Sequence, residues 1–269
     1  MNFLIRSLRG NGLFSITSGL AAIVFAGPLS ERMTVPVPAV LIVGLGVLAF
    51  GISIVWSTRK STVDPLFALA VIVSDLIWVV VALVVIVIPG ILTAKWILGL
   101  VTTVVGLFAL LQILGLVRLT SQDPKRLETE IEIDAAPELV WSVITDLASY
   151  SDWNPFIVDA HGDATVGGRV DVEMRPEGGK AIRFAPTVTE ATAPSEFEWL
   201  GHLGPRGLFD GRHRFELVPT EAGTRLRHSE EFTGLLVPLL AKSLDAGTLD
   251  GFRAMNEAMK RRIETSSHN

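Results

Sequence analysis

The chain has 269 residues, a length typical of two domains, and its mean hydropathy of +0.47 is high enough to place part of it in a membrane. Its net charge of −5 divides unevenly, because residues 1–120 carry 7 basic and 3 acidic side chains and the remainder carries 16 and 25. The acidic remainder argues against nucleic-acid binding, and the absence of cysteine excludes disulfides, thiolate nucleophiles and cysteine-ligated metal sites.

Four apolar segments precede residue 120. The first, residues 13–26, follows Arg6 and Arg9 and is typical either of a cleaved signal peptide or of a first transmembrane helix. Residues 36–56, 66–88 and 91–117 each approach or exceed the roughly 20 residues that span a bilayer. We therefore predict an α-helical membrane domain of four transmembrane helices over residues 1–119, with a tight turn at Pro89-Gly90 between the last two.

Basic residues divide the ends of these segments into two sides. One side carries Arg6, Arg9, Arg59, Lys60, Arg118, Lys125 and Arg126, whereas only Arg32 and Lys95 fall on the other. Cytoplasmic loops carry the excess of Lys and Arg. We therefore expect a multi-pass protein of a bacterial plasma (inner) membrane, with both termini in the cytoplasm.

Asp75 is the one acidic residue inside a predicted span, and it lies near the middle of the bilayer. Folding the last two spans into a hairpin places Thr102 and Thr103 at a similar depth. We expect Asp75 to form a hydrogen bond with one of these threonines or with Ser74. The alternatives are a proton or substrate pathway and a helix contact within an oligomer.

A second domain is predicted over residues 126–265, after a linker at residues 120–125. Alternating residues 128–133 predict a strand, and the following stretch, residues 136–156, reads APELVWSVITDLASYSDWNPF. Pro137 suits a first helical turn, and Trp153-Asn154-Pro155 ends a second short helix. This order and these residues resemble the START-like superfamily, of the polyketide cyclase/dehydrase and lipid-transport type, over about residues 125–262.

The resemblance implies an α+β helix-grip fold, in which an antiparallel sheet wraps around a long C-terminal helix with a hydrophobic cavity between them. Alternation along the later strands and a helical pattern over residues 235–263 agree with this fold. The residues expected to line the cavity are Trp141, Trp153, Val172, Met174, Phe184, Phe197, Trp199, His213, Phe215, His228, Glu230, Leu244, Gly247, Gly251 and Met255.

Gly247 and Gly251 lie one turn apart inside the predicted helix, where each costs up to about 1 kcal/mol relative to alanine. Their missing side chains leave room for a ligand, or they let the helix approach the sheet closely. Both interpretations stay open at the level of sequence.

Three polar residues on the last two strands share the parity of apolar neighbours and should point toward the cavity: His213, His228 and Glu230. If Leu217 faces Leu226 across the hairpin, His213 falls opposite Glu230. The cluster is then an internally satisfied buried pair, a polar end that orients a ligand, a general acid/base centre or a metal site of two histidines and one carboxylate.

From these features we expect a membrane-anchored START-like protein that binds a lipid or another hydrophobic small molecule in its cytoplasmic domain. The alternatives are an enzyme resembling polyketide cyclases or dehydratases, with His213, His228 and Glu230 as catalytic residues, and a membrane assembly or adaptor protein. No cofactor and no metal is expected. The expected partners are the hydrophobic ligand and the lipid bilayer, without nucleic acid.

Overall fold

The computed structural model describes residues 3–88, 95–175 and 180–266. The chain divides into two compact units, Met1–Leu119 and Thr120–Asn269.

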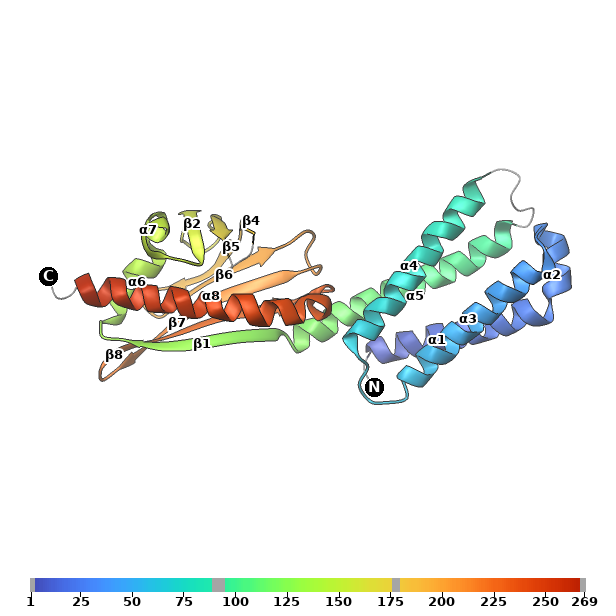
Figure 1. The fold of residues 1–269 in the computed structure, drawn as a ribbon, viewed down its shortest axis with the longest axis horizontal. Coiled ribbons are helices and arrows are strands. Elements are labelled where there is room, and N and C mark those ends of the chain that lie inside the picture. Colours follow the sequence, from blue (N-terminus) through green and yellow to red (C-terminus); the bar gives the residue numbers. More distant parts are fainter. Residues whose placement is uncertain (1–2, 89–94, 176–179, 267–269) are drawn as a thin grey trace. The chain divides into compact units, whose positions relative to one another are not determined.

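The first unit is helical (Figure 1). It consists of α1 (Phe3–Val24), α2 (Ala26–Met33), α3 (Val37–Ser57), α4 (Pro65–Val87) and α5 (Lys95–Gln122), the last of which continues three residues past the unit boundary. Three helices, α3, α4 and α5, are long and apolar enough to cross a membrane. The segment predicted as a first span instead forms α1 and α2, which meet at a bend of 85°. The predicted turn at Pro89-Gly90 lies outside the described residues.

Glycines set the contact between α1 and α3. A Cβ added at Gly19 would lie 2.6 Å from the backbone nitrogen of Leu48, and one added at Gly51 would lie 2.6 Å from the carbonyl oxygen of Gly12. Gly44 in turn lies against the backbone of Gly19. The two helices therefore touch backbone to backbone at two points seven residues apart, a close approach that only small residues allow.

Asp75 of α4 has a partner that differs from the one expected. Its carboxylate accepts a hydrogen bond of 2.7 Å from Asn11 Nδ2 on α1. Ser74 and Thr103 bond to carbonyl groups of their own helices, and the buried Thr102 hydroxyl has no hydrogen-bond partner among the described residues. The expectation that Ser74, Thr102 or Thr103 bonds Asp75 is therefore wrong. Asn11 lies on α1 and Asp75 on α4, so the pattern within a single span could not predict this pairing.

The second unit begins with β1 (Lys125–Ile133), α6 (Pro137–Thr145), a short 3-10 helix (Leu147–Ser149) and α7 (Tyr150–Trp153). The remaining elements are β2 (Ile157–Gly162), β3 (Val170–Met174), β4 (Ile182–Phe184), β5 (Thr187–Thr192), β6 (Glu196–His202), β7 (Asp210–Thr220), β8 (Gly223–Thr233) and α8 (Val237–Ser266). A five-stranded antiparallel sheet has the order β1-β8-β7-β6-β5, and a second has the order β2-β3-β4. Figure 1 shows α8 lying along the five-stranded sheet.

The chain passes from one sheet to the other between β4 and β5. Pro186, which lies between these two strands, has no N–H to donate to a ladder. Backbone hydrogen bonds from Val170 N to Pro186 O (3.0 Å) and from Val188 N to Gly168 O (2.9 Å) still join the two sheets. Only Asp123 and Pro124 separate α5 from β1, so this connection is shorter than the expected linker.

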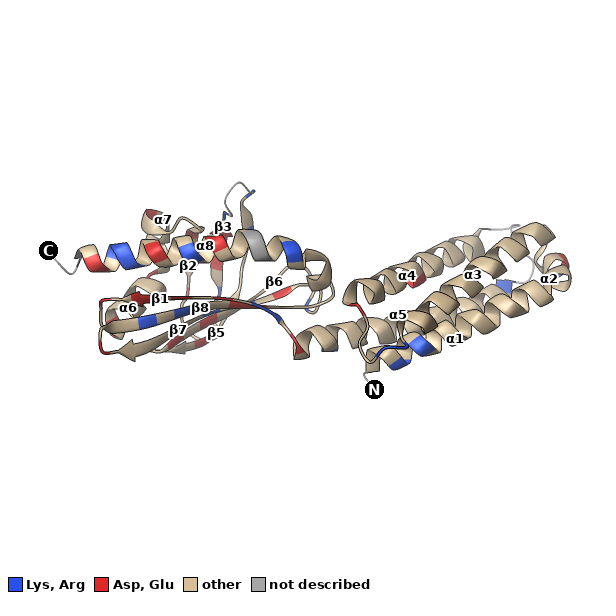
Figure 2. Ribbon diagram, turned by 60° about the horizontal axis from the view of Figure 1, so that its bottom comes forward, with Lys and Arg blue, Asp and Glu red and all other residues tan. Residues whose placement is uncertain are grey.

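The two faces of the five-stranded sheet differ in polarity. The face toward α8 carries the hydrophobic core, which includes Phe197, Trp199 and Phe215. The other face carries cross-strand ion pairs, among them Arg225 with Glu132 and Arg227 with Glu130, each at 2.7 Å. Figure 2 shows that charged residues are frequent along the strands and α8 of the second unit, whereas the helices of the first unit carry few of them.

Candidate functional site

The candidate site lies on the inner face of the sheet, where β7 and β8 pair. The register places His213 opposite Glu230, Phe215 opposite His228 and Leu217 opposite Leu226. This is the pairing that the alternation of the two strands predicts. All three polar side chains are buried, with exposed fractions of 2% for His213, 0% for His228 and 6% for Glu230.

A chain of polar contacts runs from β7 across β8 to α8. His213 Nε2 lies 2.8 Å from His228 Nε2, and His228 Nδ1 lies 2.8 Å from Asn256 Oδ1 on α8. Asn256 Nδ2 donates to Thr129 Oγ1 on β1 at 2.9 Å. Thr129 Oγ1 in turn donates to the carbonyl oxygen of His228 at 3.4 Å. Three strands and the long helix are thus joined through one buried network.

The orientation of Asn256 fixes the direction of every proton in this network. Its amide nitrogen donates to Thr129, so its oxygen must accept, and His228 therefore carries its proton on Nδ1. The bare Nε2 of His228 then accepts from Nε2–H of His213. This leaves Nδ1 of His213 as a free acceptor, and it faces Glu230 Oε2 at 3.5 Å.

Burial keeps the whole network uncharged. It lowers the pKa of His213 to about 3 and raises the pKa of Glu230 to about 8. Burial, and then the neighbouring His213, lower the pKa of His228 well below its usual value. At neutral pH both imidazoles are therefore neutral and the Glu230 carboxyl is mostly protonated, so it is able to donate a hydrogen bond.

Aromatic rings enclose the two imidazoles. His213 stacks on Trp199 with ring centroids 4.8 Å apart, and His228 stacks on Phe252 of α8 at 3.9 Å. Phe215 approaches both histidine rings, at 4.8 Å and 4.6 Å. This packing leaves His228 no route to a bound molecule.

Glu230 differs from the histidines because it lies beside a stretch of sheet without side chains. Gly201 on β6 pairs with Gly211 on β7, and a Cβ at Gly211 would lie 2.6 Å from Glu230 Oε1. The Phe184 ring approaches the position of a Cβ at Gly201 to 3.3 Å. Glu230 Oε2 is buried without a hydrogen-bond partner among the described residues. The carboxyl of Glu230 thus lies over Gly211 with Oε1, while its Oε2, which faces His213 Nδ1, has unused bonding capacity.

The expected lining residues divide into a packed part and a more open part. Phe197, Trp199, Phe215, Met255 and Val172 belong to the buried core, together with the histidines. Partly buried residues packed against that core are Trp141, Trp153, Met174, Phe184 and Leu244. The inner surface near the two histidines is therefore filled by protein side chains, whereas Met174, Phe184 and Leu244 are only partly buried.

The structure decides between the two interpretations for Gly251 of α8 but not for Gly247. A Cβ at Gly251 would overlap the Phe156 ring, so this glycine serves a close approach, and the space beside it is filled. Gly247 is partly buried, and its two interpretations, room for a ligand or close packing, both stay open.

Two cavities among the described residues, of about 650 and 480 Å³, are lined by other residues and do not lie between α8 and the sheet. No cluster of three His, Asp or Glu residues within the described ranges could hold a metal ion.

Sequence reasoning missed Asn256 and the glycine pair Gly201 and Gly211. Asn256 was detectable in principle, because it is a polar residue on the buried face of the last helix, next to Met255 and one turn before Met259 and Lys260. The glycines were not, because their importance arises from their position opposite one another in neighbouring strands.

The antiparallel sheet with α8 across its inner face, preceded by two short helices after β1, defines a helix-grip domain of the START-like type. The model of a family described as polyketide cyclase/dehydrase and lipid transport matches residues 124–264, and the chain belongs to this family. The predicted family resemblance is thereby confirmed, and with it a fold that generally binds hydrophobic ligands.

Solved structures resemble this chain at low sequence identity. Protein NE0264 from Nitrosomonas europaea is 18% identical, with a TM-score of 0.44, over 54% of this chain and 97% of that chain. Protein Ms6760 from Mycobacterium smegmatis is 20% identical, with a TM-score of 0.45, over 52% and 91%. The di-domain ARO/CYC protein StfQ from the steffimycin biosynthetic pathway is 11% identical, with a TM-score of 0.49, over 63% and 62%. No significant match is found among curated proteins.

Proposed function

We propose that this protein is anchored in a membrane and binds a lipid or another hydrophobic small molecule in its START-like domain. The observation that carries the proposal is Glu230, a buried and protonated carboxyl whose Oε2 has no hydrogen-bond partner among the described residues. An unsatisfied buried polar atom costs about 1–3 kcal/mol, which a ligand oxygen would offset by accepting its proton.

The ligand would place its apolar body against Met174, Phe184 and Leu244, the partly exposed members of the expected lining. Its single polar atom would meet the carboxyl of Glu230, which lies over Gly211. Apolar surface with one orienting polar group is typical of small-molecule sites. It also agrees with the family, whose description includes lipid transport.

The first unit would serve as the anchor. Helices α3, α4 and α5 are candidate spans, and a fourth would require the bent pair α1 and α2 to enter the bilayer together. The excess of Lys and Arg favours cytoplasmic termini in a plasma (inner) membrane. Lys95, on the opposite side, donates hydrogen bonds from Nζ to the carbonyl oxygens of Ile86 and Ile88.

The direct test is native mass spectrometry of the full chain released from detergent, followed by extraction and identification of any bound molecule. We expect a stoichiometric apolar adduct in the wild type. Glu230→Leu should lose most of it, while Glu231→Leu on the opposite face of the same strand should retain it. A wild-type chain that stays free of adduct after incubation with a panel of lipids and aromatic polyketides would refute the proposal.

One observation favours an enzyme as the second candidate. A directed relay of hydrogen bonds runs from His213 through His228 to Asn256, and Glu230 Oε2 lies 3.5 Å from its outer end at His213 Nδ1. The Glu230 carboxyl has a pKa of about 8, which suits proton donation near neutral pH. In that case Glu230 would be the catalytic acid in a cyclisation or dehydration, and His213 its positioning residue.

The carrier and the enzyme predict different effects of Glu230→Gln on ligand affinity and turnover. The amide of the introduced glutamine would still donate a hydrogen bond, so a carrier should retain its ligand with a loss of affinity of less than about tenfold. An enzyme should keep binding and lose turnover by about 100-fold or more, because glutamine cannot transfer a proton.

A further inference from the structure

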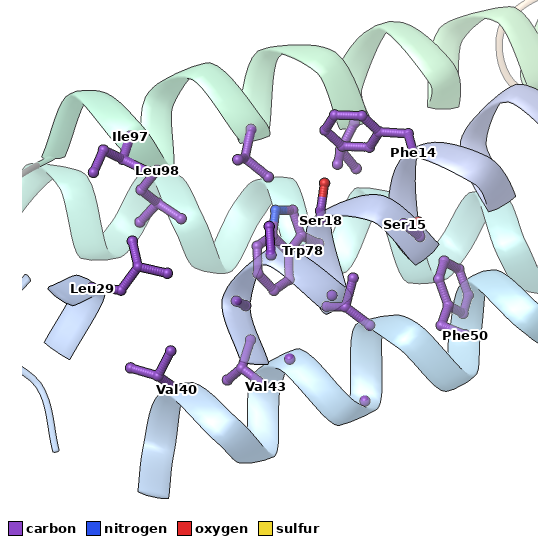
Figure 3. Close-up of a pocket in the computed structure, with 18 of the residues that line it drawn as sticks. Phe14, Ser15, Ser18, Leu29, Val40, Val43, Phe50, Trp78, Ile97 and Leu98 are labelled. Carbon is purple, nitrogen blue, oxygen red and sulfur yellow. The ribbon is translucent and has the colours of Figure 1, made fainter. Parts of the chain in front are cut away.

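The helical unit contains a cavity of its own. It has a volume of about 650 Å³, within the range of roughly 300–1,000 Å³ typical of ligand pockets. All five helices contribute to its wall, and Figure 3 shows the apolar side chains of Phe14, Leu29, Val43, Phe50, Ile97 and Leu98 around it. The occupant must therefore be mainly apolar.

A few polar groups lie on one part of the wall. Asp75 and Ser15 belong to the hydrogen-bonded group around Asn11, so their polar atoms are engaged. Trp78, also labelled in Figure 3, is different: its Nε1 is buried and has no hydrogen-bond partner in the described parts of the chain. An indole N–H can only donate, so this atom calls for a ligand that supplies an acceptor.

The charge of the wall narrows the class of ligand further. The described lining residues include neither Lys nor Arg, so a buried anionic group would have no counter-charge. A phosphate or free carboxylate is thus disfavoured inside the cavity. A carbonyl or hydroxyl oxygen of an uncharged lipid fits, because it is neutral and accepts a hydrogen bond.

Exposed apolar residues of α3 at the cavity wall indicate that a ligand would enter from the bilayer. Val43, on the wall, is 49% exposed, and its neighbours on α3, Ile42 and Leu45, are 71% and 57% exposed. In a membrane-spanning helix this apolar outer surface faces acyl chains. A molecule that enters past Val43 comes from the hydrocarbon region and brings no water with it.

We propose that this cavity binds a neutral lipid drawn from the hydrocarbon region of the bilayer, with its acyl chain in the cavity and one neutral oxygen accepting a hydrogen bond from Trp78 Nε1. The inference rests on the membrane insertion proposed above and is independent of any ligand of the START-like domain. It gives the helical unit a binding role in addition to anchoring.

Two glycines offer matched variants for the test. Gly46 lies on the cavity wall, and a Cβ added to it would meet nothing within 4 Å, so Gly46→Leu should narrow the cavity without a clash. Gly99 on α5 is equally unobstructed and is not part of the wall, so Gly99→Leu is the control. Trp78→Phe removes the donor and keeps most of the ring.

The experiment uses the full chain in nanodiscs of phosphatidylethanolamine and phosphatidylglycerol, with a trace of an uncharged diacylglycerol that carries a diazirine in one acyl chain. After illumination, labelled peptides are identified by mass spectrometry. We expect labelling concentrated on the cavity-lining segments of α3, α4 and α5. It should fall at least fivefold in Gly46→Leu and about threefold in Trp78→Phe, and it should be unchanged in Gly99→Leu.

Three results would overturn the inference. Equal labelling of the wild type and Gly46→Leu would identify only the lipids that surround any membrane protein. An unlabelled cavity wall in a chain that is dimeric in the nanodiscs, and monomeric after Gly46→Leu, would assign the cavity to a second copy. A chain that does not enter the nanodiscs at all would refute membrane insertion together with the cavity proposal, whereas the first two results leave insertion standing.

Discussion

At the scale of single residues, the inner network is unusual because three titratable side chains are held neutral by burial. Such a network is favourable only when each member has a partner, since a buried polar atom without one is costly. Four members of the network form hydrogen bonds with one another: His213, His228, Asn256 and Thr129. Glu230 leaves one oxygen unused, which is why it is the member of the network we assign to ligand binding.

The pKa values predict how stability depends on pH. The pKa of Glu230 is raised from 4.5 to about 8, so its contribution is fully present below pH 4.5 and is lost as the pH rises toward 8. The pKa values of His213 and His228 are lowered from 6.5, so their contribution is present above pH 6.5 and is lost as the pH falls. The network should therefore be most stable near pH 6.5.

We expect the protection of β7 and β8 amides against hydrogen exchange to fall between pH 6.5 and 8, by up to about 1.4 kcal/mol per pH unit after correction for intrinsic exchange rates. Glu230→Gln should remove this decline and leave the acidic decline in place. A decline of equal slope in wild type and variant would show that Glu230 is ionised in the folded protein.

Asn256 gives a second prediction at this scale. Asn256→Leu leaves His228 Nδ1–H and Thr129 Oγ1 without their present partner, so it should destabilise the domain by about 2–4 kcal/mol. Glu257→Leu, one residue further along on the exposed face of α8, should change stability by less than about 0.5 kcal/mol. Urea unfolding of the full chain in detergent, followed by near-ultraviolet circular dichroism, measures both; similar midpoints would contradict the role given to Asn256.

At the scale of elements, small residues decide where helices meet. Gly19 and Gly51 allow α1 and α3 to touch, while Gly46 on the same helix α3 faces open space. The contact between α1 and α3 in turn brings Asn11 to Asp75.

We expect Gly19→Val and Gly51→Val to lower the melting temperature of the detergent-solubilised protein by roughly 5 °C or more, because the added methyl groups force the two helices apart. Gly46→Val should melt within about 2 °C of the wild type. Thermal unfolding followed by fluorescence-detected gel filtration compares the three variants, and equal melting temperatures would argue against the backbone contact of α1 with α3.

At the scale of the whole molecule, the protein combines an apolar helical unit with a charged sheet unit. The absence of cysteine makes its topology accessible, because each introduced cysteine is the only one in the chain. The proposed topology places the α3–α4 connection and the START-like domain in the cytoplasm, and α2 on the other side.

Glu31→Cys should thus react with a membrane-impermeant maleimide in intact cells. Ser61→Cys and Glu221→Cys should react only after the cells are permeabilised. All three positions are exposed in the structure, so a lack of reaction reports the side of the membrane and not burial. Labelling of Glu221→Cys in intact cells would place the START-like domain outside the cytoplasm and contradict the proposal.

The sequence by itself determined the features that depend on neighbouring residues. Hydropathy located the three candidate spans, and the motif around Trp153-Asn154-Pro155 identified the family. Alternation along β7 and β8 predicted that His213 would face Glu230, because side chains of a strand point to the two faces in turn and the hairpin fixes the register.

Only the tertiary structure decided which distant residues became partners. It joined His228 to Asn256, set Gly201 opposite Gly211, filled the space at Gly251 with Phe156 and gave Asp75 the partner Asn11. It also opened a cavity among the helices where the sequence indicated only an anchor. The reason is physical: these contacts depend on how close two elements approach and at what angle, and that distance is set by the packing of all the side chains between them.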